Sequence, residues 1–133
     1  MLKSAKGLFA LSLCTAVLGL GSAVAAPDGG SLAGTWSGGG SVTFGSGAKE
    51  RARCRATYSR TSKTSYVVNA TCATQSGKVS QSATVRGSGS NYSGSFYNPD
   101  YDASGTISVT VHGASQTVRL IGSKGSALLR LSR

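Results

Sequence analysis

Apolar and polar side chains alternate along most of the chain beyond about residue 30, and this part shows no helical periodicity. Three clear alternating runs span about residues 34–44, 49–60 and 65–74. Because successive side chains of a strand point to opposite faces, each run predicts a strand with one apolar face. In these three runs and five later ones, the residues expected to point inward are Trp36, Val42 and Phe44; Ala52, Cys54, Ala56 and Tyr58; Tyr66, Val68, Ala70 and Cys72; Val79, Ala83 and Val85; Tyr92, Gly94 and Phe96; Ile107, Val109 and Val111; Val118 and Leu120; and Ala127, Leu129 and Leu131.

Short turn sequences, such as those at 76–77, 98–100 and 123–125, separate the eight expected strands. Short connections make neighbouring strands antiparallel, so the alternatives are a sandwich or a closed up-and-down barrel. A barrel leaves no exposed edges, and we therefore predict an all-β, eight-stranded antiparallel up-and-down barrel. One face of every strand is polar, which indicates a barrel surrounded by water rather than an outer-membrane barrel.

Two cysteines fall in the second and third expected strands. If a turn at 61–65 pairs Arg60 with Tyr66, the same register places Cys54 opposite Cys72 on the inward face. Cross-strand neighbours of this kind are close enough for a disulfide, which we predict. A metal site would need more ligands than two cysteines and the single histidine of the chain can supply.

The first 25 residues have the pattern of a bacterial signal peptide. Lys3 and Lys6 precede an apolar stretch at 7–20, and Ala23-Val24-Ala25 follows as an A-x-A cleavage sequence. We expect cleavage after Ala25 and a periplasmic or secreted protein, in which 26–33 is a flexible segment and 34–133 is the barrel. The alternative is an uncleaved anchor, for which the apolar stretch is short.

The mature chain would be strongly basic. Loss of Lys3 and Lys6 lowers the formal net charge from +10 to +8. This excess favours an anionic partner, either an anionic glycan, a lipid headgroup or an acidic protein surface. Export argues against nucleic acid, and the alternative is that the charge only keeps the protein in solution.

One expected strand carries a row of cations. Lys49, Arg51, Arg53 and Arg55 alternate with other residues, so they share the outward face at intervals of about 7 Å. Like charges in a row repel, whereas guanidinium groups bind carboxylates and phosphates at two points. This row is our candidate anion-binding site, and we expect Arg60 and Lys63 to continue its positive character into the adjoining turn.

A second candidate site is a turn near residue 100, where two tyrosines stand beside amide and carboxylate groups. Such groups suit a contact with a protein or a sugar, although the sequence also suits a plain turn. Two carboxylates are too few for a dedicated calcium site. The candidate partner-binding residues of this turn are Tyr97, Asn98, Asp100, Tyr101 and Asp102.

The sequence gives no support for catalysis. His112 is expected on the polar face of a strand, and no serine lies in a G-x-S-x-G sequence between a strand and a helix. We therefore expect a protein that is not an enzyme and holds no cofactor or metal. Many expected inward residues are small, which indicates either an internal cavity or a narrow, filled barrel. We favour the filled barrel.

Gly34-Thr35-Trp36 resembles the G-x-W signature of the lipocalin and calycin barrels. The resemblance implies that Trp36 closes one end of the barrel and that a basic residue of the last strand packs across it; Arg130 matches that position. Small bacterial metalloproteinase inhibitors are the most similar in size, export and disulfide number, although their cysteines lie elsewhere.

These features predict an exported, non-enzymatic binding protein that docks an anionic envelope component or acidic partner through the basic strand. One alternative is a protease or lysozyme inhibitor acting through 26–33 or the turn at 97–102. Another is a carrier of a small apolar ligand inside the barrel, which a filled barrel disfavours.

Overall fold

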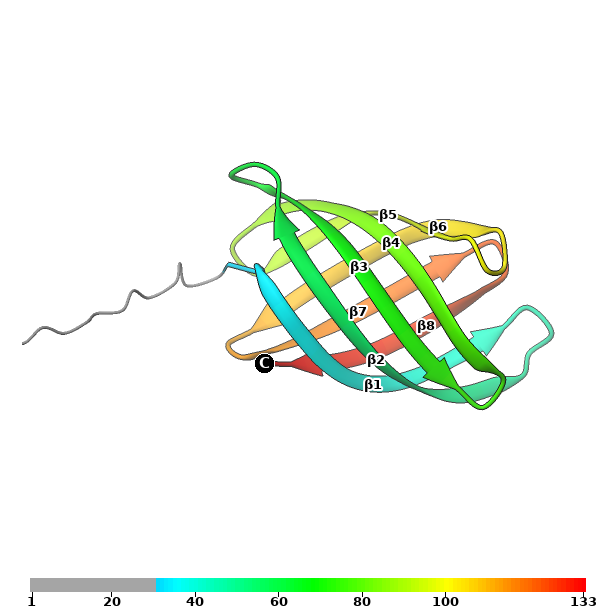
Figure 1. The fold of residues 1–133 in the computed structure, drawn as a ribbon. Coiled ribbons are helices and arrows are strands. Elements are labelled where there is room, and N and C mark those ends of the chain that lie inside the picture. Colours follow the sequence, from blue (N-terminus) through cyan, green and yellow to red (C-terminus); the bar gives the residue numbers. More distant parts are fainter. Residues whose placement is uncertain (1–30) are drawn as a thin grey trace, which may run out of the picture.

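The computed structural model describes residues 31–133, which form one closed antiparallel barrel whose strands follow one another in chain order (Figure 1). β1 pairs with β8 as well as with β2, so every strand of this barrel has two neighbours. The predicted fold is therefore confirmed. The strands are β1 (Gly34–Phe44), β2 (Lys49–Arg60), β3 (Ser65–Thr74), β4 (Gly77–Ser88), β5 (Asn91–Asn98), β6 (Ala103–His112), β7 (Ser115–Gly122) and β8 (Gly125–Ser132).

The predicted signal peptide and its cleavage site lie outside the described residues. Within 31–133, the chain contains no helix of the length and apolarity needed to cross a membrane.

Strand alternation places apolar side chains inside the barrel, as the sequence pattern predicts. On β2, for example, buried Cys54 and Ala56 alternate with exposed Arg53 and Arg55. Cys54 and Cys72 form the predicted disulfide across the β2–β3 pair, in the predicted register. The core thus consists of one inward face from each strand, closed on itself.

A run of three glycines in β1 lets this strand approach both of its neighbours. A Cβ atom at Gly38 or Gly40 would collide with a backbone carbonyl of β8, and one at Gly39 would collide with a carbonyl of β2. Any larger residue would therefore push the strands apart. The glycines are needed for the close approach between the first and last strands, which closes the barrel.

One end of the barrel is closed by Trp36 of β1 together with residues that precede β1 and a residue that follows β8. Trp36 and Leu32 are fully buried, and the Trp36 Nε1 donates a hydrogen bond to the Leu32 carbonyl at 2.9 Å. The Arg133 guanidinium lies 4.2 Å from the centroid of the Trp36 ring. It also donates hydrogen bonds of 2.8 Å to the carbonyls of Ala33 and Ser31.

This end differs from the prediction in two ways. The assignment of Arg130 as the partner of Trp36 is wrong, because Arg130 alternates with the inward Leu129 and Leu131 and is therefore exposed on the outside. Arg133, beyond the end of β8, takes that role. The expected flexible segment 26–33 also needs correction, since its described part, residues 31–33, packs onto the barrel end.

Candidate functional site

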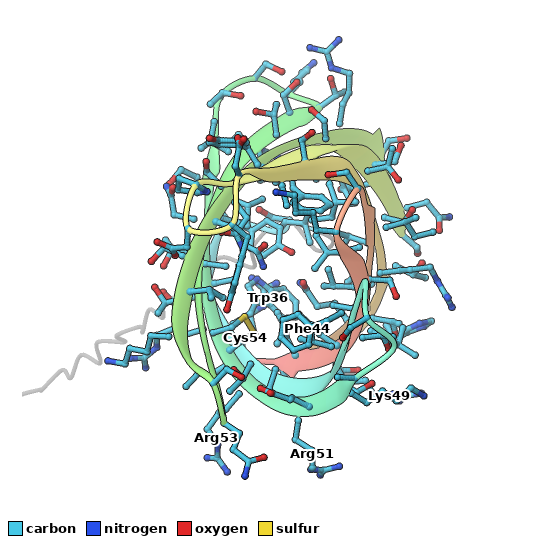
Figure 2. The ribbon with its side chains drawn as sticks, turned by 90° about the vertical axis from the view of Figure 1, so that its right-hand side faces the viewer. Trp36, Phe44, Lys49, Arg51, Arg53 and Cys54 are labelled. Atoms are coloured by element: carbon cyan, nitrogen blue, oxygen red, sulfur yellow. A yellow bond between two sulfur atoms is a disulfide. The ribbon has the colours of Figure 1, made fainter. Side chains whose placement is uncertain are left out.

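The end opposite Trp36 contains a cavity of about 110 Å³. Its walls are mainly apolar, with Phe44, Phe96 and Leu129 among them, and Lys124 lies at its rim. A smaller cavity of about 30 Å³ lies deeper and shares Phe96 and Leu129 with the first. Figure 2 shows Phe44, Trp36 and Cys54 inside the ring of strands. The expectation of a filled barrel is therefore wrong at this end, where small side chains such as Ala127 leave space.

The turn predicted as a partner-binding loop is held against the rim of this cavity. The Asn98 Oδ1 accepts hydrogen bonds from the backbone N–H groups of Asp100 and Tyr101, at 2.9 and 3.3 Å. Asp100 accepts a 2.7 Å hydrogen bond from the Ser80 N–H. The Tyr101 ring meets Phe44 edge-on, with 6.2 Å between the ring centroids. Asn98 and Tyr101 therefore line the cavity entrance.

The other two candidate residues of this turn point elsewhere. The Tyr97 hydroxyl donates a 3.3 Å hydrogen bond to Asp102, and the charge of that carboxylate raises the pKa of Tyr97. Lys124 donates a 3.0 Å hydrogen bond to the Tyr101 carbonyl, which fixes the turn further. The five predicted residues thus form one tightly bonded turn, but only part of it faces the cavity.

The predicted basic row is present on the outside of β2. Lys49, Arg51, Arg53 and Arg55 are all exposed, and we call these four residues the basic face. Figure 2 shows Lys49, Arg51 and Arg53 pointing away from the barrel. Ala52 and Cys54, which separate the three arginines along β2, point inward, whereas Glu50 lies between Lys49 and Arg51.

Arg60 and Lys63 do not continue this row. Arg60 has the inward parity of Tyr58, and at the end of β2 its guanidinium packs over the Tyr66 ring, 5.4 Å from the centroid. Lys63 lies in the β2–β3 turn at the same end. Both residues are exposed at the end of β2 and in the adjoining turn, as expected, but they lie off the basic face, and their part in anion binding stays a prediction.

Acidic side chains in the described part of the chain are engaged with neutral donors. Glu50 accepts hydrogen bonds from the Ser76 hydroxyl at 2.6 Å and the Ser76 N–H at 3.1 Å, and the hydroxyl bond in particular lowers the pKa of Glu50. Asp100 and Asp102 hold the turn described above. Within 31–133, none of these carboxylates forms an ion pair with the basic face.

Two polar side chains, Tyr58 and Gln116, are paired inside the barrel near the plugged end. The Tyr58 hydroxyl donates a 2.6 Å hydrogen bond to the Gln116 Oε1, and both side chains are buried. Burial raises the pKa of Tyr58. The Gln116 Nε2 has no hydrogen-bond partner among the described residues. Sequence patterning did not reveal this pair, because Gln116 reads as a polar residue at the start of a strand.

His112 is exposed at the end of β6. Residues 31–133 bring together no group of three histidine, cysteine, aspartate or glutamate side chains that could hold a metal ion.

No protein-family model matches the sequence, and no curated protein sequence matches it either. Solved structures share its fold. A redesigned β-barrel, mFAP1, bound to DFHBI, covers 77% of this chain and 94% of its own, at 16% identity and a TM-score of 0.64. A fluorescence-activating β-barrel designed de novo covers 77% of this chain and 93% of its own, at 17% identity and a TM-score of 0.60. These likenesses show the eight-stranded barrel fold.

Proposed function

We propose that this chain is an exported, non-enzymatic binding protein that docks an anionic partner through the basic face. The observation that supports this most directly is the row of exposed cations on β2, which form no ion pair with the carboxylates of the described part. Guanidinium groups spaced at about 7 Å along a strand repel each other until an anion lies among them. A partner with several carboxylate or phosphate groups relieves that repulsion and gains two-point hydrogen bonds.

The test is binding of the purified protein to long-chain polyphosphate, followed by calorimetry at increasing sodium chloride. We expect binding that weakens steeply with salt, because exposed charges are screened. The variant Arg51→Gln/Arg53→Gln should lose most of this affinity. The matched control is Lys78→Gln/Arg86→Gln, which removes the same charge from exposed positions on β4 and should retain the affinity. Equal losses in both variants would show that only net charge matters and would refute a specific basic face.

The cavity supports a second candidate function, the binding of a small apolar ligand at the open end. A dry apolar cavity of about 150 Å³ in another protein binds benzene, so a space of this order can hold one ring. The similar barrel mFAP1 is bound to DFHBI, which illustrates what the fold can accommodate. Indole should then raise the melting temperature of the protein, and Ala127→Leu, which fills the cavity, should abolish the rise. An equal rise in both proteins would place the indole elsewhere.

The inhibitor alternative stays a prediction without a supporting observation. The turn expected to contact a target enzyme is bonded to the barrel rim through Asn98, Asp100 and Lys124. Residues 31–33, the described part of the other expected contact segment, plug the barrel end. A target enzyme would have to contact these residues in their packed positions.

A further inference from the structure

Two large aliphatic side chains are exposed on the outer surface of the last two strands. Ile121 on β7 is 57% exposed and Leu128 on β8 is 43% exposed. They are neighbours, because the β7–β8 register pairs Ile121 with Ser126, two residues before Leu128. The rest of the outer surface of these strands is hydroxyl-bearing or basic. The two residues therefore form a small apolar patch.

Arginines border this patch on its own strands. The strand register places Arg119 of β7 directly beside Leu128. Arg130 is the next outward residue along β8 and, like Arg119, is exposed. Apolar and cationic side chains thus alternate on the outer surface of β7 and β8.

The basic face lies on the far side of β1 from this patch. Leu128 pairs with Ser41, which pairs with Arg51, and Arg130 pairs with Gly39, which pairs with Arg53. Since neighbouring strands lie about 4.8 Å apart, roughly 10 Å of backbone separates β8 from β2. Only serine and glycine occupy the outward positions of β1 between them at 37, 39 and 41. β1 therefore carries no bulky side chain between the two sets of arginines, whose long side chains can bend around the curved wall toward a partner on the β1 side of the barrel.

This arrangement discriminates between classes of anionic partner. A single-stranded nucleic acid is bound through stacking aromatic side chains, and the outward positions of β7, β8, β1 and β2 contain none. An acidic glycan would use the arginines but would leave Leu128 and Ile121 exposed to water. A bilayer of anionic lipids accepts both, because phosphates meet the arginines at the depth where aliphatic side chains enter the acyl layer.

We infer that the anionic partner is a lipid surface, which the β7–β8–β1–β2 face contacts with Leu128 and Ile121 inserted and with Arg51, Arg53, Arg119 and Arg130 at the phosphates. The inference rests on the proposed function, since it names the source of the anion that the basic face binds. A small apolar contribution added to several cations gives the pair of signals that reversible membrane attachment requires.

The experiment is co-sedimentation of the purified protein with vesicles of phosphatidylcholine alone or of phosphatidylcholine and phosphatidylglycerol at 3:1. We expect binding to the mixed vesicles only. Leu128→Ser/Ile121→Ser should weaken binding to the mixed vesicles about ten-fold or more, because in the unaltered protein each of the two side chains would bury about half of its apolar surface in the lipid. The same variant should bind polyphosphate as the unaltered protein does. Val67→Ser, which removes a partly exposed apolar residue from the outer surface of β3, is the control and should bind the mixed vesicles normally.

Two outcomes would overturn the lipid inference but leave the proposed function standing. One is unchanged vesicle binding by Leu128→Ser/Ile121→Ser; the other is no vesicle binding at all while polyphosphate binding still depends on Arg51 and Arg53. The second outcome would indicate a soluble polyanion or glycan. If Arg51→Gln/Arg53→Gln changed neither polyphosphate nor vesicle binding, the proposed function would fail as well. Trp36 fluorescence verifies that each variant is folded.

Discussion

At the scale of single residues, one guanidinium group links the segment before β1 to the end of β8, where the first and last strands close the barrel. Arg133 stacks on the Trp36 ring and donates hydrogen bonds to the carbonyls of Ser31 and Ala33. These carbonyls precede β1, whereas Arg133 follows β8. The contact therefore holds the plug, with the buried Leu32, against the barrel end.

Arg133→Ala should lower the free energy of unfolding by about 1–3 kcal/mol, because it removes one cation–π contact and two hydrogen bonds that the charged guanidinium donates to backbone carbonyls. Urea unfolding followed by the fluorescence of Trp36, the single tryptophan, measures this directly. Arg133→Lys keeps the charge but not the two-point geometry, so an intermediate loss is expected. An unchanged unfolding midpoint in Arg133→Ala would show that the plug is held by Leu32 and Trp36 alone.

The buried pair Tyr58–Gln116 yields a prediction that contrasts a single with a double substitution. Tyr58→Phe leaves the Gln116 carbonyl oxygen without its hydrogen-bond donor, which should cost about 1–3 kcal/mol. Tyr58→Phe/Gln116→Leu removes both polar groups and should be more stable than the single variant. Chemical denaturation of the three proteins tests the order. A double variant less stable than Tyr58→Phe would contradict it.

The raised pKa of Tyr58 also predicts a pH dependence. Below pH 10, the ordinary pKa of the phenol, it is neutral in both the folded and the unfolded state. Above pH 10 the unfolded state loses the proton first, because burial disfavours the charged form in the barrel. The free energy of unfolding should therefore fall as the pH rises beyond 10, and less steeply in Tyr58→Phe. Equal slopes in the two proteins would exclude Tyr58 as the source.

At the scale of elements, the alternation of side chains determines what the sequence could predict. The predicted ranges 34–44, 49–60 and 65–74 match β1, β2 and β3. An alternating pattern bounded by clear turn sequences allows few other positions for the ends of a strand. The disulfide register was predictable for the same reason. The basic face followed from parity alone, and its exposure is confirmed, whereas its role stays a proposal.

The errors arose where contacts do not follow strand alternation. Arg133 and Leu32 lie outside the strands, so no periodic pattern marks them as the plug around Trp36. The contact of Arg60 with the Tyr66 ring lies at the strand end, where the alternation no longer decides which way a long side chain turns. The open-end cavity depends on how small side chains from several strands meet, which spacing along one strand does not show.

The glycine run of β1 gives a prediction at this scale. Gly40→Ala should destabilise the barrel by about 1–3 kcal/mol, because the new methyl group would meet the Leu128 carbonyl and force β1 and β8 apart. Ser41→Ala is the matched control, since it lies next along the same strand with an outward side chain. Unfolding midpoints in urea compare the two. Equal stability would mean that the β1–β8 pair relaxes at little cost.

At the scale of the whole molecule, the two ends of the barrel differ from each other, and one side of it carries the basic face. The plugged end buries Trp36, the other end opens into the 110 Å³ cavity, and the basic face lies along the side between them. Separate surfaces allow a lateral docking site and an end-on cavity to be occupied independently. The two proposed sites can therefore be tested with independent variants.

The pairing of β1 with β8 means that the proposed docking side is assembled from segments that are far apart in the sequence: β1 and β2 come first among the strands of the barrel, and β7 and β8 come last. No contiguous half of the polypeptide carries this side. A circular permutant that joins residue 133 to residue 31 through a short glycine linker, and opens at the exposed turn 113–114, would place β7, β8, β1 and β2 in one uninterrupted stretch. It should fold with native Trp36 fluorescence and retain vesicle binding. A permutant that fails to fold would show that the pairing of β1 with β8 must form last, between strands that are not joined by a short connection.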